Sequence, residues 1–386
     1  MIKIGYKASA EQFGPMELLH FICLAEELGC DSAWISDHFQ PWRHNGGHAP
    51  NSIAWLGAAG ARTSRITLGT SVLTPCFRYH PSIVAQAFAT LGAMFEGRIV
   101  LGVGTGESLN EVPASGMTWP EQSERTARLR EAVELIERLW KEPRLTFEGR
   151  YYRTENATIY DRPDTQIPIF IAGAGPFMAK LAGKTADGFI CTSGKPTALY
   201  EERLLPNLNL GLAERQRSAP FERMIEIKLS YDEDPGRALN NTRFWGALAL
   251  SPAEKVDVED PIDMERLADA LPIERAASRW IVSSDPDAVI EAIRAYVAMG
   301  FNHLVFHSPA ADQERFLKLL ARDIIPRLKL VSSLDNPKGA LAGGTVFRSL
   351  SGADGHQGTS AAKPQKSDRS DDATSQDVTT SDAPLF

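Results

Sequence analysis

The chain alternates short apolar runs with longer stretches of helical periodicity. The runs are apolar at successive positions, which is typical of strands buried on both faces of a parallel sheet. They are KIGY at residue 3, SAWIS at 32, ITLGT at 66, IVLGV at 99, PIFIA at 168, GFICT at 188, IEIKLS at 225 and HLVFHS at 303. Helical stretches lie at 15–29, 51–61, 81–95, 120–140, 176–185, 286–298 and 312–330. Eight strands with helical crossovers predict a (β/α)8 TIM barrel.

We assign residues 1–330 to one barrel domain, which is longer than the roughly 250 residues usual for this fold and therefore carries insertions. The segment 232–272 is the main expected insertion, between the seventh strand and the next helix. An open doubly wound sheet has the same strand–helix rhythm and is the structural alternative. Residues 336–386 are rich in Ser, Asp, Thr and Gly, so we expect a disordered tail.

Composition excludes several classes of protein. The formal net charge of −8 does not suit a nucleic-acid partner, whose backbone requires a basic face. We find neither the apolar core of a signal peptide nor a run approaching the roughly 18 apolar residues of a membrane span. The four cysteines form no C-x-x-C pair, which favours reduced, mostly buried thiols. We therefore expect a cytoplasmic enzyme that binds neither nucleic acid nor membrane.

Polar or glycine-rich segments directly follow the second to the sixth predicted strands. They are SDHFQPW at residue 36, SVLTP at 71, GTGESLN at 104, GAGPFM at 173 and TSGK at 192. In a TIM barrel, chemistry takes place at these strand ends, so His38 and Glu107 could face one cavity as an acid–base pair. Taken alone, His38 could be a structural hydrogen-bonding group and Glu107 a carboxylate that stabilises a helix start.

Three local patterns resemble known binding motifs but do not complete them. GAGPFM lacks the third glycine and the later acidic residue of a dinucleotide fingerprint, although Pro176 can open a helix whose free N–H groups favour an anion. GFICTSGKP lacks the spacing of a P-loop; its Thr192 and Lys195 could hold one phosphate or form a solvated turn. The glycines in RHNGGHA prevent a helical pair of histidine ligands, and we expect no metal.

Several longer segments carry a resemblance to a known enzyme family. They are GYKASAEQF, SDHFQPWRHNGGHAP, LGTSVLTPCFRYHPSIVAQAFATLG, LGVGTGESLNE, DGFICTSGK, MIEIKLSYDEDPGRALNNTRFW, RWIVSSDPD and NHLVFHSP. From Lys3 to about Leu330 the chain resembles the F420-dependent glucose-6-phosphate dehydrogenases, which belong to the luciferase-like superfamily of barrel oxidoreductases. The resemblance implies a homodimer that oxidises glucose 6-phosphate at C1 to 6-phosphogluconolactone and transfers a hydride to C5 of coenzyme F420.

The same resemblance implies roles for particular residues. His38 and Glu107 match an acid–base pair, and Trp42 matches the aromatic ring beside the reacting atoms. The coenzyme's surroundings are matched by Asp37, Ser71, Val72, Thr74, Gly106, Asn110, Ala174, Gly175, Phe177 and Met178. The phosphate clamp is matched by Thr192, Lys195, Lys255 and Arg279. A cis Ser71–Val72 bond is also expected. The sequence does not decide which of His38 and Glu107 is the base.

One position departs from the family pattern. The family has a histidine after the clamp lysine, whereas here Val256 follows Lys255. Valine cannot hydrogen-bond a sugar hydroxyl, so oxidation of other or several sugar 6-phosphates is an alternative to strict glucose specificity. An FMN-dependent luciferase-like monooxygenase and a non-catalytic F420 carrier are further alternatives. The carrier is disfavoured because it has no use for a matched acid–base pair.

Overall fold

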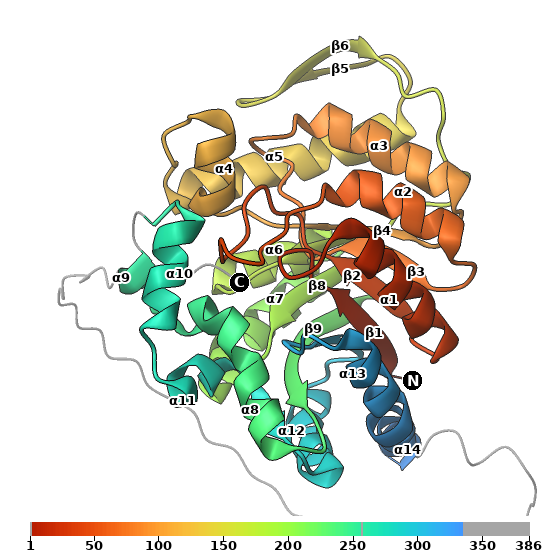
Figure 1. Cartoon of the computed structure of the whole chain (residues 1–386). Helices are drawn as coiled ribbons and strands as arrows, with labels where there is room; N and C mark the ends of the chain where they lie inside the picture. The colour runs from red at the N-terminus through yellow and green to blue at the C-terminus, as the bar shows by residue number, and fades with distance from the viewer. Residues whose placement is uncertain (1, 256–257, 335–386) are drawn as a thin grey trace, which may run out of the picture.

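The computed structural model describes residues 2–255 and 258–334, and its centre is a closed barrel of eight parallel strands (Figure 1). In barrel order the strands are β1 (Lys3–Ala8), β2 (Ser32–Ile35), β3 (Thr67–Thr70), β4 (Ile99–Val103), β7 (Ile169–Ala172), β8 (Gly188–Thr192), β9 (Glu222–Tyr231) and β11 (His303–His307). Pairing of β8 with β9, and of β11 with β1, closes the ring. The predicted TIM barrel is confirmed, and the open doubly wound sheet is excluded.

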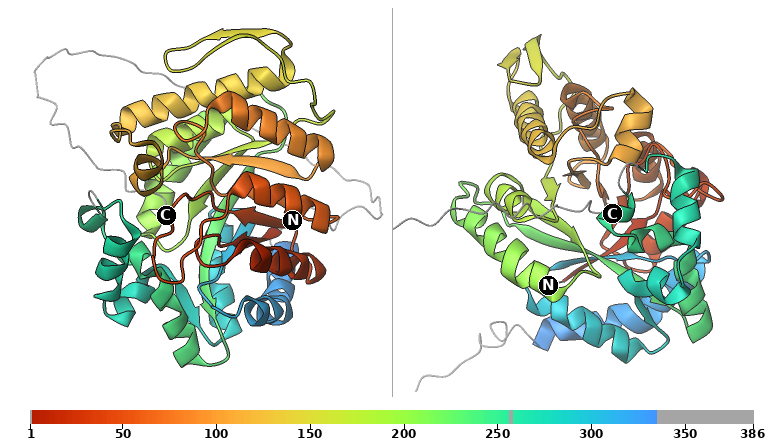
Figure 2. Two further views of the ribbon diagram at one scale, coloured as in Figure 1. Left: turned by 45° about the horizontal axis from the view of Figure 1, so that its top comes forward. Right: turned by 90° about the vertical axis from the view of Figure 1, so that its left-hand side faces the viewer.

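Helices surround the barrel, as Figures 1 and 2 show from three directions. They are α1 (Pro15–Glu27), α2 (Ser52–Arg62), α3 (Pro81–Met94), α5 (Gln122–Lys141), α6 (Pro176–Thr185), α7 (Leu205–Ala213), α12 (Pro286–Ala298), α13 (Gln313–Leu319) and α14 (Ile325–Leu334). Four of them begin with proline, whose fixed φ suits a first helical turn. The Asp285 side chain caps α12 by accepting from the N–H of Asp287. None of the helices in the described part of the chain has the length and apolarity needed to cross a membrane.

Two insertions extend the barrel near its C-terminal mouth. After β9 the chain forms α8 (Pro235–Asn241), the 3-10 helix η2 (Thr242–Ala249), α9 (Pro252–Lys255), α10 (Pro261–Asp269), α11 (Ile273–Ala276) and the short turn η3 (Ala277–Arg279). This is the predicted insertion, and it continues to β10 (Ile281–Ser283), which pairs with the end of β9. The second insertion, between β4 and β7, contains α4 (Ser108–Ser115), α5 and the antiparallel hairpin of β5 (Leu145–Glu148) and β6 (Arg153–Ala157). The sequence prediction missed α4 and the hairpin.

Large side chains fill the N-terminal half of the barrel interior. Trp34 is fully buried, and its ring stacks on Phe170 with centroids 5.5 Å apart. Its indole N–H donates to the Ser32 hydroxyl oxygen (2.9 Å), which lies 2.6 Å from Nε2 of His303. The other ring nitrogen of His303 is 2.8 Å from a carboxylate oxygen of Glu222. These contacts fill the interior between the two ends of the barrel, and a second cavity of about 630 Å³ at the N-terminal end is bordered by Trp34, Phe170 and His303. In a TIM barrel the chemistry takes place at the C-terminal mouth.

We predict that Gly69→Ala in β3 destabilises the barrel, because a Cβ there would lie 2.5 Å from the Trp34 ring. Trp34 cannot move away, since Phe170 and His303 pack against it. Overpacking of this kind costs about 1–3 kcal/mol, measurable as a lower urea midpoint. The control is Gly57→Ala in α2, where the nearest atom is 3.9 Å away; it should raise stability by about 0.5–1 kcal/mol. Equal stability of the two variants would contradict this packing argument.

Candidate active site

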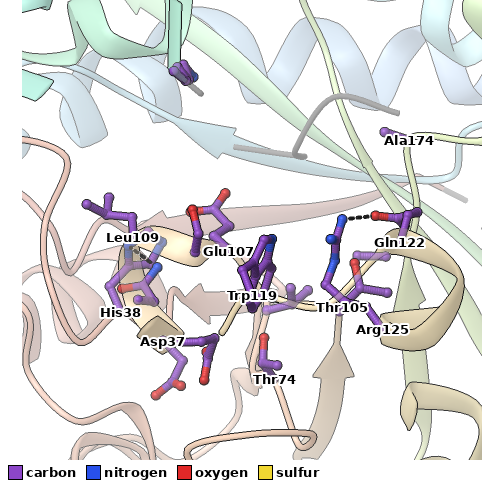
Figure 3. Close-up of a pocket in the computed structure, with 18 of the residues that line it drawn as sticks. Asp37, His38, Thr74, Thr105, Glu107, Leu109, Trp119, Gln122, Arg125 and Ala174 are labelled. Carbon is purple, nitrogen blue, oxygen red and sulfur yellow. Dashed lines mark hydrogen bonds between the residues drawn. The ribbon is translucent and has the colours of Figure 1, made fainter. Parts of the chain in front are cut away.

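A cavity of about 380 Å³ opens at the C-terminal ends of β2, β3, β4 and β7 (Figure 3). Helices α4 and α10 of the two insertions also border it, through Leu109 and Met264. The predicted site residues that line this cavity are Asp37, His38, Trp42, Val72, Thr74, Gly106, Glu107, Asn110, Ala174, Gly175, Met178 and Lys255. Side chains from five separate stretches of sequence therefore converge on one space, as the barrel prediction required.

Five predicted residues lie elsewhere. Ser71 is buried behind the cavity wall, where its carbonyl oxygen accepts a hydrogen bond from Lys7 Nζ (2.5 Å); the Ser71–Val72 bond is cis, as expected. The Phe177 side chain lies on α6 and is 62% exposed. Thr192, Lys195 and Arg279 do not line the cavity: Thr192 is buried at the end of β8, and Lys195 and Arg279 belong to a neighbouring group of cations described below.

His38 is buried in a network of polar contacts. Its Nε2 lies 3.2 Å from a carboxylate oxygen of Glu11, and its Nδ1 lies 3.2 Å from the side-chain amide nitrogen of Asn110. Burial lowers the pKa of His38 more than the nearby Glu11 carboxylate raises it. The pKa of Glu11 is also below its usual value: burial opposes ionisation, but His38 and Lys7 outweigh it. His38 is therefore a neutral imidazole near pH 7, facing an ionised carboxylate.

Sequence reasoning missed Glu11. It follows β1, the one strand among the first six that carries no predicted site residue at its C-terminal end. The segment after that strand reads SAEQ, so an acid stands where the other strand ends carry their chemistry. The Ser36 hydroxyl donates to Glu11 (2.6 Å), which connects the ends of β1 and β2.

Glu107 stands at the start of α4 with both carboxylate oxygens buried and, among the described residues, without a hydrogen-bond partner. Burial raises the pKa of Glu107 well above its usual range; Lys255 opposes this rise, and the acids Glu11 and Glu111 add to it. The carboxyl group is therefore held in its protonated form around neutral pH. Burial thus lowers the pKa of His38 and raises the pKa of Glu107, so both groups are uncharged near neutral pH.

Arg78 holds the loop that contains His38. Its guanidinium contacts a carboxylate oxygen of Asp37 (2.9 Å) and one of Glu111 (3.1 Å). Asp37 also accepts from the hydroxyl of Ser52 (2.6 Å). Two acids that border the cavity are therefore paired outside it, and Asp37 is fixed rather than free to take part in proton transfer. Arg78 had no predicted role.

The far end of the same loop is held by the insertion. Glu265 of α10 accepts from the backbone N–H groups of His44 and Asn45, and it pairs with Arg43 at 2.9 Å. No three His, Cys, Asp or Glu side chains in the described ranges lie together so that they could hold a metal ion. The polar residues of this loop are thus used to attach it to α10.

A group of cations borders the site on its other side. Arg279 donates from Nε to the carbonyl of Gly194 (2.7 Å), whose φ of +73° and close approach to Arg279 both require glycine. Lys255 Nζ lies 4.5 Å from the centre of the Trp42 ring. Burial, with a smaller contribution from the charges of Arg279 and Lys228, lowers the pKa of Lys195 to about 8. Within the described part of the chain, Lys195, Lys255 and Arg279 have no carboxylate oxygen within 4 Å.

Below this group, the barrel interior contains four polar side chains that sequence reasoning also missed. Glu226 is 3.4 Å from Lys7 Nζ, 3.0 Å from Lys228 Nζ and 3.1 Å from Nδ1 of His307. The signal was present: Glu226 and Lys228 are two residues apart in an apolar strand and therefore share its inward face. The apolar residues on either side of them, Ile225, Ile227 and Leu229, make the run typical of a buried strand.

Unsatisfied polar atoms mark the mouth of the barrel. Trp42 Nε1, Trp280 Nε1, His307 Nε2 and both Glu107 oxygens are buried without a hydrogen-bond partner in the described residues. Leaving such a group unpaired costs about 1–3 kcal/mol, so folded proteins rarely gather several in one place. The set contains both donors and acceptors beside unpaired cations. It fits a polar ligand that carries hydroxyl groups and negative charge.

The chain matches the family model for luciferase-like monooxygenases over residues 1–303. It is 61% identical over 329 residues to the F420-dependent glucose-6-phosphate dehydrogenase of Nakamurella multipartita, covering 85% of this chain and 97% of the relative. It is 60% identical over 332 residues to the enzyme of the same name from Intrasporangium calvum, covering 85% and 99% of the two chains.

Solved structures agree with the fold. An F420-dependent secondary alcohol dehydrogenase in complex with an F420–acetone adduct superposes with a TM-score of 0.78 at 32% identity, covering 84% of this chain and 98% of that one. The F420-dependent tetrahydromethanopterin reductase of Methanopyrus kandleri has a TM-score of 0.70 at 22% identity, covering 84% and 99%, and so supports the fold alone. The chain belongs to the luciferase-like monooxygenase family and, within it, to the F420-dependent glucose-6-phosphate dehydrogenases.

Proposed function

We propose that this chain oxidises glucose 6-phosphate at C1 to 6-phosphogluconolactone, with hydride transfer to coenzyme F420. The observation that carries the proposal is a neutral His38 and a protonated Glu107 in one cavity, beside cations that have no carboxylate partner. A sugar phosphate brings both the hydroxyl that needs a base and the dianion that the cations lack. The relatives named above carry the same activity in their names.

The cavity residues suit the coenzyme. Gly106 has a φ of +82°, and a Cβ there would lie 2.9 Å from Thr74, so only glycine keeps this part of the wall open. Asn110, Ala174, Gly175 and Met178 complete the surface that would hold the coenzyme. Bound F420 would supply a deazaflavin ring that accepts a hydride at C5. Ser71 would support the cavity wall from behind, and the exposed Phe177 side chain would contact the part of the coenzyme that leaves the cavity.

His38 is the proposed base. Its neutral ring can take the proton of the C1 hydroxyl as the hydride leaves C1. The Glu11 carboxylate, 3.2 Å from Nε2, orients the ring and stabilises the imidazolium that forms. Glu107 is the proposed acid, because its raised pKa keeps a proton available on a carboxyl group at neutral pH. That proton can balance the negative charge which the coenzyme acquires.

Lys195, Lys255, Arg279 and Thr192 are the proposed phosphate clamp. Transfer of a dianion out of water requires several converging charges, and charge-assisted hydrogen bonds supply the specificity. Val256, the position that departs from the family pattern, lies outside the described residues. Turnover of other sugar 6-phosphates therefore remains the second candidate, on the sequence departure alone.

We also infer that the protein is a homodimer, as the resemblance implies, and that it is cytoplasmic, as its composition and cysteine pattern suggest. Exposed apolar side chains on the outer face of α3, Ile83 (54% exposed) and Met94 (59% exposed), support an interface between copies.

We expect the purified protein to bleach F420 absorbance when glucose 6-phosphate is added. Hexose 6-phosphates compared by kcat/KM then give the specificity order. Preferential binding of FMN would favour the monooxygenase instead, and bound F420 without bleaching by any sugar phosphate would favour the carrier.

The pH profile follows from the two shifted groups. As the base, His38 must be neutral, and its lowered pKa places the acid limb of kcat below about pH 6.5. As the acid, Glu107 must be protonated, so kcat falls as pH rises through its raised pKa. Glu107→Gln should lower kcat about 10²–10⁴-fold and abolish the alkaline limb measured at saturating substrate. An alkaline limb that persists in Glu107→Gln would assign it to another group.

Lys195→Ala should raise KM for glucose 6-phosphate about 10- to 100-fold, because one charged contact to phosphate is lost. In the same variant, turnover of unphosphorylated glucose should not change. In the unmodified enzyme, kcat/KM for glucose 6-phosphate should decline as pH rises through about 8, because Lys195 loses its proton there. The matched control is Lys180→Ala on α6, a 44% exposed lysine paired with Glu214. Equal losses with glucose and glucose 6-phosphate would exclude Lys195 from the clamp.

A further inference from the structure

Arg125 lines the cavity from the first turns of α5 and has no role in the chemistry described above. In Figure 3 it lies with Gln122 on the side of the cavity where Ala174 is, away from His38 and Asp37. The charges that affect the pKa of Arg125 do not include those of Lys195, Lys255 and Arg279. No residue of the predicted site accounts for the charge of Arg125.

The contacts of Arg125 are all neutral. One terminal nitrogen donates to the Pro120 carbonyl (2.6 Å), the other contacts the side-chain oxygen of Gln122, and the guanidinium carbon lies 4.8 Å from the Trp119 ring. Nε is buried without a hydrogen-bond partner in the described residues. Burial lowers the pKa of Arg125, and Glu121 opposes this only from a distance, since the two do not form an ion pair within 4 Å.

Such a cation is unusual on physical grounds. Arg128, one turn further along α5, pairs with Glu124 at 2.7 Å and compensates its charge inside the helix. Arg125 instead keeps one N–H group unsatisfied and its charge unpaired beside a cavity. A partly buried guanidinium in this state is stabilised by an anion that enters the cavity, because five N–H donors match phosphate and carboxylate oxygens.

The start of α6 borders the same cavity and also favours an anion. Ala174 and Gly175 line it, Pro176 occupies the first helical position, and no side chain caps the helix. The free N–H groups of this first turn and the helix dipole favour negative charge. Two independent features, a guanidinium and a helix start, therefore prefer an anion here.

We propose that Arg125 binds the anionic side chain of the coenzyme, together with the first turn of α6. The inference rests on the proposed function, because F420 carries a phosphodiester and glutamyl carboxylates on the side chain that extends from its deazaflavin ring. His38 and Glu107 act beside the deazaflavin ring, and the group of Lys195, Lys255 and Arg279 binds the sugar phosphate. Arg125 binds the remaining anion, the side chain of the coenzyme. Arg125 would contribute affinity for F420 and no proton chemistry.

The test compares two ligands by fluorescence titration of the whole chain: F420, and the deazaflavin nucleoside that lacks the phosphate and the glutamates. We expect Arg125→Gln to raise Kd for F420 about 10- to 100-fold and to leave Kd for the nucleoside unchanged. Arg125→Lys should recover part of the loss, since charge remains while the fork of donors does not. Arg128→Gln is the matched control and should alter neither Kd.

Equal weakening of both ligands by Arg125→Gln, or no weakening of either, would overturn the inference. If Arg125→Gln does not fold, the unmodified protein still decides: Kd for F420 should rise with ionic strength, whereas Kd for the nucleoside should not. Equal salt dependence would also overturn the role of Arg125. Failure of the unmodified protein to bind F420 at all would instead contradict the proposed function.

Discussion

The site depends on charge balance inside the barrel. Glu226 lies between Lys7 and Lys228, and its ionised carboxylate, together with that of Glu11 near Lys7, compensates two ammonium groups that are almost fully buried. Buried charges are tolerated only when paired, and removing one partner leaves a penalty of several kcal/mol. Lys7 also donates to the Ser71 carbonyl beneath the cavity wall, while the charge of Lys228 is felt by Lys195 and Lys255. One carboxylate thus connects the coenzyme wall to the cationic side.

With the interior charges balanced, the remaining charges acquire a function. Lys195, Lys255 and Arg279 are in excess on one side of the mouth and Arg125 on another, whereas Asp37 and Glu111 both pair with Arg78. The positive charge left over is therefore divided between two places. This division suits two separate anions, a sugar phosphate and the side chain of a coenzyme, better than one large anion.

The sequence predicted the barrel well because its strands are short, apolar and spaced by helices, and because polar segments follow five of them. Prediction from sequence failed where the role of a residue depends on contacts that form only when the barrel closes. Glu11 and His38 lie on neighbouring strand ends, so their pairing could have been inferred. Glu226 and Lys7 meet only across the interior, and Arg279 reaches Gly194 through a backbone contact, which no local pattern encodes. The β5–β6 hairpin was missed because its exposed, charged positions resemble a loop.

The choice of base and acid illustrates how one physical effect can set two roles. Burial disfavours the charged form of any group, so it lowers the pKa of an imidazole and raises that of a carboxyl. His38 and Glu107 are both buried in one cavity, and burial is the largest cause of each shift. A charged neighbour is therefore not needed to decide which group is the base. Burial in the same cavity leaves the His38 ring unprotonated and the Glu107 carboxyl protonated. The carboxylates that stay ionised, Glu11 and Glu226, are those with a lysine or histidine in direct contact.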